Sequence, residues 1–112
     1  MKSPKDLSPR LKEALRLFVK ELDEHIGAFE QHLGEEVEEP KSDSKNNILR
    51  LKNRFHLIKG GAGFFDLEEI QDTAAEGERL CEEPKSSEFL GRLEGLVEAL
   101  SRQRKNFDDF EE

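Results

Sequence analysis

The sequence predicts an all-α protein, an antiparallel up-down-up-down four-helix bundle. Apolar residues recur at the three-and-four spacing of amphipathic helices in four separate segments, and no segment alternates with the period of a strand. Residues that end helices lie between the segments. The 112 residues, 34% of them hydrophobic, suit a single domain covering 1–112. We expect helices over roughly residues 9–33, 45–65, 67–82 and 87–107.

The first helix is predicted to begin at Ser8 and Pro9, a capping hydroxyl followed by proline at the first helical position. Its apolar stripe continues for more than five turns, and Gly34 is expected to end it. An acidic loop with Pro40 follows, over residues 35–44. The stripe contains Leu11, Leu15, Phe18, Leu22, Ile26, Phe29 and Leu33.

The second helix is expected to have a buried face and a polar face. The buried stripe contains Ile48, Leu51, Phe55, Ile58, Ala62 and Phe65. At about 100° per residue, Lys52, Lys59, Gly60 and Gly63 all lie within about 60° of His56, on the other face. Leu49 shares that face, either as part of a docking patch or as a lone exposed leucine.

The third helix is predicted to be capped by Asp66, with Glu69 completing a capping box and Phe65 and Ile70 forming a hydrophobic staple. Two small residues on its inner face permit a close approach between helices. Its inner stripe contains Leu67, Ile70, Ala74, Gly77 and Cys81. A turn over residues 84–87 leads to the fourth helix. The apolar residues of that helix are Phe89, Leu93, Leu96, Val97, Leu100 and Phe107.

Composition excludes several classes of protein. The net charge of −8 argues against nucleic acid as a partner, and no apolar run approaches the ~20 residues of a membrane span. Cys81 is the single cysteine, which excludes an internal disulfide and is expected to serve packing. The charged beginning of the chain is unlike a signal peptide. We therefore expect a cytoplasmic monomer that contacts neither nucleic acid nor membrane.

The face that carries His56 is unusual in its charge and its glycines. Five basic residues and no acidic residue lie between Ser44 and Phe65, within an acidic chain. Three glycines follow His56 although each costs roughly 1 kcal/mol relative to alanine inside a helix. A basic surface around an imidazole suits an anion held at the histidine and an acidic partner that delivers it. The plainer alternative is an incidental surface histidine.

An imidazole can accept a phosphoryl group at neutral pH. A free histidine has a pKa of about 6.5, so an unprotonated ring nitrogen is available as a nucleophile. A nearby ammonium such as that of Lys59 would stabilise the charge on the phosphoryl oxygens.

The stretch from His56 to Gly63, His-Leu-Ile-Lys-Gly-Gly-Ala-Gly, resembles the signature of histidine-containing phosphotransfer (HPt) domains. It is most similar to the N-terminal phosphoacceptor domain of the chemotaxis kinase CheA. About ten contiguous residues carry the resemblance, and elsewhere only the helix pattern matches. Two positions depart from the family: Asp66 replaces a common glycine, and Ala75 stands where CheA domains often have a second histidine.

The resemblance implies roles for individual residues. The phosphoryl group would be carried on Nε2 of His56, and an acidic residue of the third helix would orient Nδ1. Glu78 aligns with that acidic position, and Glu76 is the alternative. Lys59 is expected to contact the phosphoryl group, with weaker expectations for Lys52. Either lysine, and Glu78, could instead be an ordinary solvated side chain.

Other sites are disfavoured by spacing. A P-loop needs glycines before its lysine, whereas Lys59 precedes them, and the dinucleotide fingerprint fails because Asp66 replaces its last glycine. His25 and His32 lie two turns apart without further ligands, so no metal site is expected. No cofactor is expected either, and any Mg²⁺ would bind the partner's carboxylates.

The predicted function is phosphotransfer through His56, from a kinase or a receiver phospho-aspartate to a receiver aspartate. The expected partners are thus a response-regulator receiver domain and a histidine kinase. The chain contains no ATP-binding segment, so we do not expect a kinase. Two alternatives remain: an excised CheA-like phosphoacceptor domain served by a separate kinase domain, and a helical adaptor that works without phosphorylation.

Overall fold

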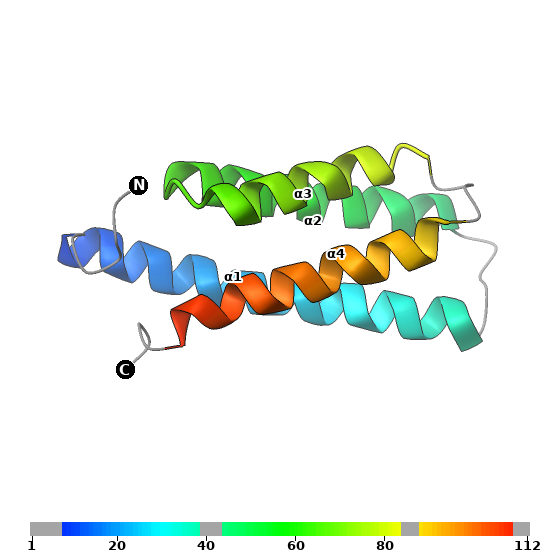
Figure 1. Ribbon diagram of the computed structural model, residues 1–112, viewed down its shortest axis with the longest axis horizontal. Helices are drawn as coiled ribbons and strands as arrows, with labels where there is room; N and C mark the ends of the chain where they lie inside the picture. Colours follow the sequence, from blue (N-terminus) through cyan, green and yellow to red (C-terminus); the bar gives the residue numbers. More distant parts are fainter. Residues whose placement is uncertain (1–7, 39–43, 84–87, 109–112) are drawn as a thin grey trace.

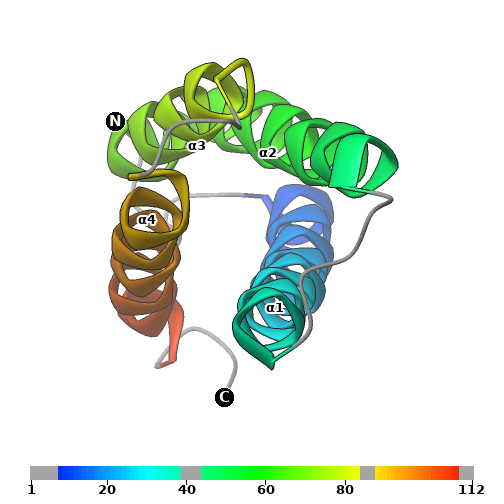
Figure 2. The same cartoon turned by 90° about the vertical axis from the view of Figure 1, so that its right-hand side faces the viewer.

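The computed structural model describes residues 8–38, 44–83 and 88–108, which form four α-helices and no strand. The helices are α1 (Pro9–Glu38), α2 (Ser44–Phe64), α3 (Glu68–Leu80) and α4 (Phe89–Arg104), and the 3-10 helix η2 (Lys105–Phe107) continues α4. Consecutive helices run in opposite directions along the long axis (Figure 1). Seen from one end, they surround a common core, with α2 and α3 above α1 and α4 (Figure 2). The predicted all-α bundle is confirmed.

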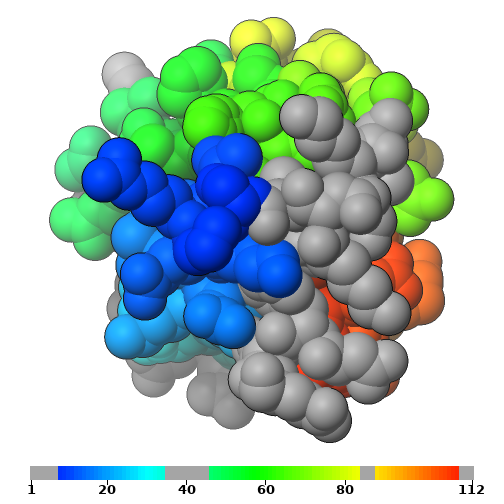
Figure 3. Space-filling view, turned by 90° about the vertical axis from the view of Figure 1, so that its left-hand side faces the viewer, coloured from blue at the N-terminus to red at the C-terminus, as the bar shows by residue number. Residues whose placement is uncertain are grey.

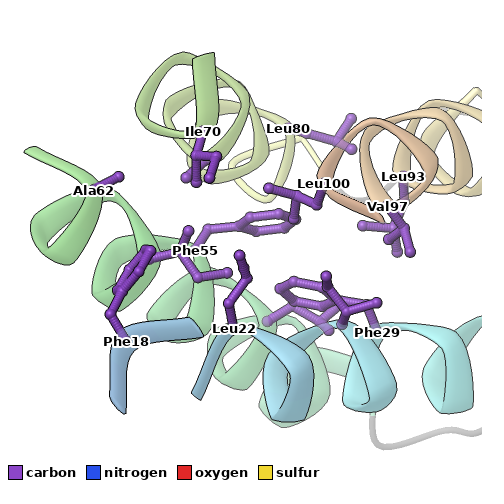
Figure 4. Packing of buried hydrophobic residues seen from close by; sticks show 14 of the residues in the cluster. Phe18, Leu22, Phe29, Phe55, Ala62, Ile70, Leu80, Leu93, Val97 and Leu100 are labelled. Atoms are coloured by element: carbon purple, nitrogen blue, oxygen red, sulfur yellow. The ribbon is translucent and has the colours of Figure 1, made fainter. Parts of the chain in front are cut away.

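The core is built from the apolar stripes that the sequence predicts. Phe29 of α1 and Phe55 of α2 stack at its centre with ring centroids 4.4 Å apart, and Phe18 packs near Phe65 at 5.9 Å. Figure 4 shows how side chains from all four helices converge on Phe55 and Leu100. Burying each large apolar side chain stabilises the bundle by roughly 1.5–3 kcal/mol relative to exposing it. Leu80 and Val19 are buried as well, outside the predicted stripes.

Helices α2 and α3 approach closely because Gly77 has no side chain. A Cβ built on Gly77 would overlap the ring of Phe55. Phe55 is fully buried, so its ring has little room to move. This small residue therefore sets the distance between the two helices, as its position in the inner stripe predicts.

The structure confirms the predicted start of α1 but not its predicted end. Ser8 caps the helix: its Oγ accepts a hydrogen bond from the Leu11 N–H at 3.3 Å. The predicted stop at Gly34 is wrong, since α1 continues to Glu38. Gly34 does not take the left-handed conformation with which glycine ends a helix, and no glycine among the described residues has positive φ. Glutamates after Gly34 propagate a helix well.

The link between α2 and α3 also differs from prediction. Asp66 does not cap α3: the N-cap is Leu67, without a side-chain hydrogen bond. Instead Asp66 has a φ of 57° and closes the end of α2. The Leu67 N–H donates to the Ala62 carbonyl at 2.8 Å and the Asp66 N–H to the Gly63 carbonyl at 3.2 Å, which is a Schellman ending. The predicted capping box with Glu69 and the staple tied to it are therefore wrong.

The remaining element boundaries agree to within a few residues. Helix α2 ends at Phe64, α3 spans Glu68–Leu80, and the predicted fourth helix becomes α4 followed by η2. Its expected start at residue 87, the turn over 84–87, and part of the predicted acidic loop, residues 39–43, lie outside the described residues. Arg104 ties α4 to α1, because its Nε and Nη2 donate to the carboxylate of Asp23 at 2.6 and 3.0 Å.

Candidate functional site

His56 lies in the middle of α2 and points away from the core. Its neighbour Phe55 and the nearby Ile58 are buried, which fixes the rotation of the helix. The imidazole side chain is 65% exposed. An approaching molecule can therefore reach the ring without any change in the bundle.

Glu78 of α3 contacts His56 and Lys59, two of the polar residues that the sequence places on one face of α2. Its Oε2 lies 3.3 Å from Nδ1 of His56, and its Oε1 lies 2.6 Å from Nζ of Lys59. The carboxylate is only 16% exposed. Glu76, the alternative acid, is exposed on α3. The structure thus brings His56, Lys59 and Glu78 together.

The charge of Glu78 is preserved by its neighbours. Burial alone would raise the pKa of this carboxyl group. The hydrogen bond and positive charge of Lys59, followed by those of His56, outweigh burial and lower the pKa below its ordinary value. At neutral pH Glu78 is therefore an anion that can accept hydrogen bonds but cannot donate them.

This contact selects one tautomer of His56. A carboxylate accepts only, so Nδ1 must carry the proton that it donates to Oε2 of Glu78. In the neutral ring, Nε2 then holds the free lone pair. The arrangement can present an unprotonated nitrogen to solvent and can stabilise positive charge on the ring.

The other predicted residues of α2 occupy different surroundings. Nζ of Lys52 lies 3.5 Å from Oε1 of Glu82, in the turn that follows α3, and both side chains are exposed, so this ion pair contributes little. Leu49 is exposed. A Cβ on Gly60 would meet nothing within 4 Å, whereas one on Gly63 would meet the Gln71 amide of α3 at 2.9 Å. Gly60 is thus open to a partner, and Gly63 sits against α3.

Several features were not singled out from the sequence. Leu17, Leu57 and Phe64 are large apolar side chains that are more than half exposed. A Cβ on Gly61 would lie 2.5 Å from Phe18, which gives this glycine a packing role between α2 and α1. Helical periodicity could have placed Leu57 and Phe64 on the outer face of α2, but the partner of Gly61 depends on how α1 packs.

A second histidine joins α1 to α2. Nδ1 of His25 lies 3.0 Å from Nη1 of Arg54, and because guanidinium only donates, Nδ1 accepts. Burial, and next the charge of Arg54, lower the pKa of His25, although Glu21 and Glu24 act in the opposite direction. This imidazole is therefore held neutral as part of the packing between the helices.

Three findings on the described residues concern metal ligands, membrane-spanning helices and the cysteine thiol. Among the described residues, no three His, Cys, Asp or Glu side chains gather as a metal site would require. None of the helices in the described segments is long and apolar enough to span a membrane. Cys81 is buried, and burial raises the pKa of its thiol to about 11.

The fold and the site define a class of protein: a four-helix bundle with an exposed imidazole on its second helix, in contact with a carboxylate of the third. The family model described as "Hpt domain" matches residues 13–103. The chain therefore belongs to the Hpt domain family, whose members carry phosphoryl groups on histidine in phosphorelay signalling and interact with kinases and receiver domains. No curated protein and no solved structure is significantly similar to the chain.

Proposed function

We propose that this Hpt domain accepts a phosphoryl group on Nε2 of His56 and passes it to an aspartate of a response-regulator receiver domain. The donor is a phospho-aspartate of another receiver, or a histidine kinase. The observation that carries the proposal is the contact between Nδ1 of His56 and Glu78, at 3.3 Å. It leaves Nε2, on an exposed ring, as the nucleophilic nitrogen.

The transfer forms one bond as another breaks. The lone pair of Nε2 attacks the phosphorus of the acyl phosphate, and the bond from phosphorus to the aspartyl oxygen breaks with its electron pair on the leaving carboxylate. With a kinase as donor, the leaving group is ADP. The phosphorylated ring gains positive charge while Nδ1 keeps its proton, and the Glu78 anion stabilises that charge. The reverse step delivers the group to the next aspartate.

The surrounding residues of α2 assist in this proposal. Lys59 is held beside the site by its ion pair with Glu78, and its ammonium stabilises the phosphoryl oxygens. Lys52 adds a second, more distant cation, and Gly60 leaves room for a partner to approach. Leu49 and Gly63 contribute to the contact with that partner. Mg²⁺, where transfer needs it, binds the receiver's carboxylates. The carrier acts as a cytoplasmic monomer.

The donor that phosphorylates this chain distinguishes the proposed function from its alternatives. A phosphorelay carrier is phosphorylated by phospho-receivers, whereas an excised CheA-like domain is phosphorylated by its kinase domain and ATP. A phosphorylation-independent adaptor is labelled by neither. The exposed, oriented ring of His56 favours the two carriers.

The direct test is the variant His56→Gln. We expect it to lose an acid-labile phosphoryl label from phospho-receivers and from phosphoramidate, with unchanged melting because the side chain is exposed. His25→Gln is the matched control and should retain the label. A label that persists in His56→Gln would refute the proposal.

A further inference from the structure

The hydrogen bond between α1 and α2 at His25 has no part in the proposed transfer. Nδ1 of His25 lies 3.0 Å from Nη1 of Arg54, and both side chains are partly buried. Because a guanidinium group only donates hydrogen bonds, Nδ1 must accept and cannot carry a proton. This contact between the helices therefore exists only while His25 is neutral.

The contact lies within the apolar packing of α1 against α2. On α1, Phe18 and Phe29 lie two turns before and one turn after His25, within about 40° of it around the helix. Phe29 stacks on Phe55, the residue after Arg54, with ring centroids 4.4 Å apart, and Phe18 packs against the C-terminal part of α2. Figure 3 views the end of the molecule where the first residues of α1 lie against the region around the α2–α3 junction. The hydrogen bond is thus a polar link between two apolar contacts, and we call this packing the α1–α2 seam.

Charged groups on both helices act on the imidazole of His25. Burial, and next the charge of Arg54 on α2, lower its pKa, whereas Glu21 and Glu24 of α1 act in the opposite direction. Glu21 is exposed and lies four residues before His25, so the two side chains are neighbours on the same side of α1. A protonated His25 therefore has an anionic partner available on its own helix.

Protonation exchanges the partner of His25. The imidazolium ion carries a hydrogen on each ring nitrogen and cannot accept from Arg54. Two positive charges would then face each other across a contact of 3.0 Å. Rotation of the ring toward Glu21 relieves this repulsion and forms an ion pair within α1. The α1–α2 seam then loses its hydrogen bond.

The stack of Phe29 on Phe55 connects the seam to the phosphoacceptor site. Phe55 is fully buried and lies between Phe29 of α1 and the backbone of Gly77 of α3. It directly precedes His56, so its position sets the rotation of α2. A weaker seam lets α2 rotate, which disturbs the 3.3 Å contact between Nδ1 of His56 and Oε2 of Glu78.

We propose that His25 is a pH-sensitive latch: in its neutral form it holds Arg54 and closes the α1–α2 seam, and in its protonated form it pairs with Glu21 and releases the seam. Release slows phosphorylation of His56. This effect on phosphorylation rests on the proposed function, whereas release of the seam is observable without it. The latch is closed at neutral pH and opens on acidification.

The first test follows the seam by NMR on the full chain, from about pH 8 to about pH 5. We expect amide signals of α1 and α2 along the seam to shift with the same midpoint as the ring signals of His25, while circular dichroism keeps its helical signal. Arg54→Gln should raise this midpoint and Glu21→Gln should lower it, because the two charges act in opposite directions. Seam signals that ignore the midpoint of His25, or loss of the helical signal at that midpoint, would overturn the latch.

The second test measures labelling of His56 by phosphoramidate over the same pH range. The matched variant is His25→Asn, whose amide oxygen can accept from Arg54 at any pH and cannot gain a proton. Because His56 titrates in both proteins, the ratio of their rates isolates the effect of His25. We expect equal rates near neutral pH.

As His25 becomes protonated, the wild-type rate should fall about tenfold further than that of His25→Asn, the low end of the loss when a group that orients a histidine is removed. Equal pH profiles of the two proteins would overturn the inference and leave the proposed function intact. Absence of label from both proteins would refute the proposed function and with it the effect on phosphorylation, while the NMR result would still decide whether the seam opens.

Discussion

Gly60 offers the sharpest separation of stability from docking, through the variant Gly60→Gln. Apart from the backbone of its own helix and its chain neighbours, nothing lies within 4 Å of a Cβ at this position, so the first carbon of the new side chain has room in the isolated domain. Replacing glycine by a good helix former should then stabilise the bundle by up to about 1 kcal/mol. For a domain of about this size, that raises Tm by roughly 4–8 °C.

The same variant should obstruct transfer. A side chain at position 60 points back toward the N-terminus of α2, over the ring of His56. A receiver must bring its phospho-aspartate within roughly 3–3.5 Å of Nε2, which a glutamine side chain hinders. Transfer from phospho-receivers should fall sharply, while labelling by phosphoramidate should change far less because the small donor needs no docking.

Gly61→Ala is the matched control for stability. A Cβ there would lie 2.5 Å from the Phe18 ring, so Phe18 must move, and overpacking of this kind costs about 1–3 kcal/mol. Thermal unfolding of both variants checks the contrast. The reasoning is refuted if Gly60→Gln unfolds at a markedly lower temperature, or if it accepts phosphate from receivers at the wild-type rate.

Three further predictions concern single residues. The variant Asp66→Gly should raise the free energy of unfolding by up to about 1 kcal/mol, because φ at this position is 57° and glycine adopts that conformation without strain. Denaturant unfolding measures this change, and an unchanged or lower midpoint would contradict the prediction. Folding lowers the pKa of His25 below 6.5, so the unfolded chain binds a proton at this residue more readily than the folded chain does. The free energy of unfolding should therefore be highest above about pH 6.5 and should decline as the pH falls through the folded-state pKa. The variant His25→Gln should flatten this part of the pH profile of stability, and a profile identical to the wild type would contradict the prediction. Glu78→Gln should slow phosphotransfer and shift the tautomer population of His56 away from protonated Nδ1, measured by ¹⁵N NMR; superimposable ring spectra would mean that Glu78 does not orient the ring.

The comparison between sequence and structure shows where local patterns suffice. The period of the apolar residues predicts four helices and nearly the whole core, because a helix fixes which side chains share a face. The same rule puts His56 on the face opposite Phe55 and Ile58, and the structure leaves its ring exposed. The resemblance to Hpt domains follows from a short contiguous motif, which does not depend on packing, and the family model that matches residues 13–103 confirms it.

Helix ends are less determined by local sequence. Gly34 is a good stop signal and Asp66 a good cap, yet α1 continues past the first, and the second ends α2 in a left-handed conformation. Each residue is compatible with more than one backbone conformation at a small difference in free energy. The path that the chain must take between packed helices decides among them.

The relations between helices were decided by the tertiary structure alone. Gly60 and Gly61 are adjacent and chemically identical, but only Gly61 lies against Phe18. The pairing of Glu78 with both His56 and Lys59 likewise depends on the offset between neighbouring helices. That offset results from the interlocking of core side chains such as Phe55 with Gly77, and periodicity within one helix carries no information about it.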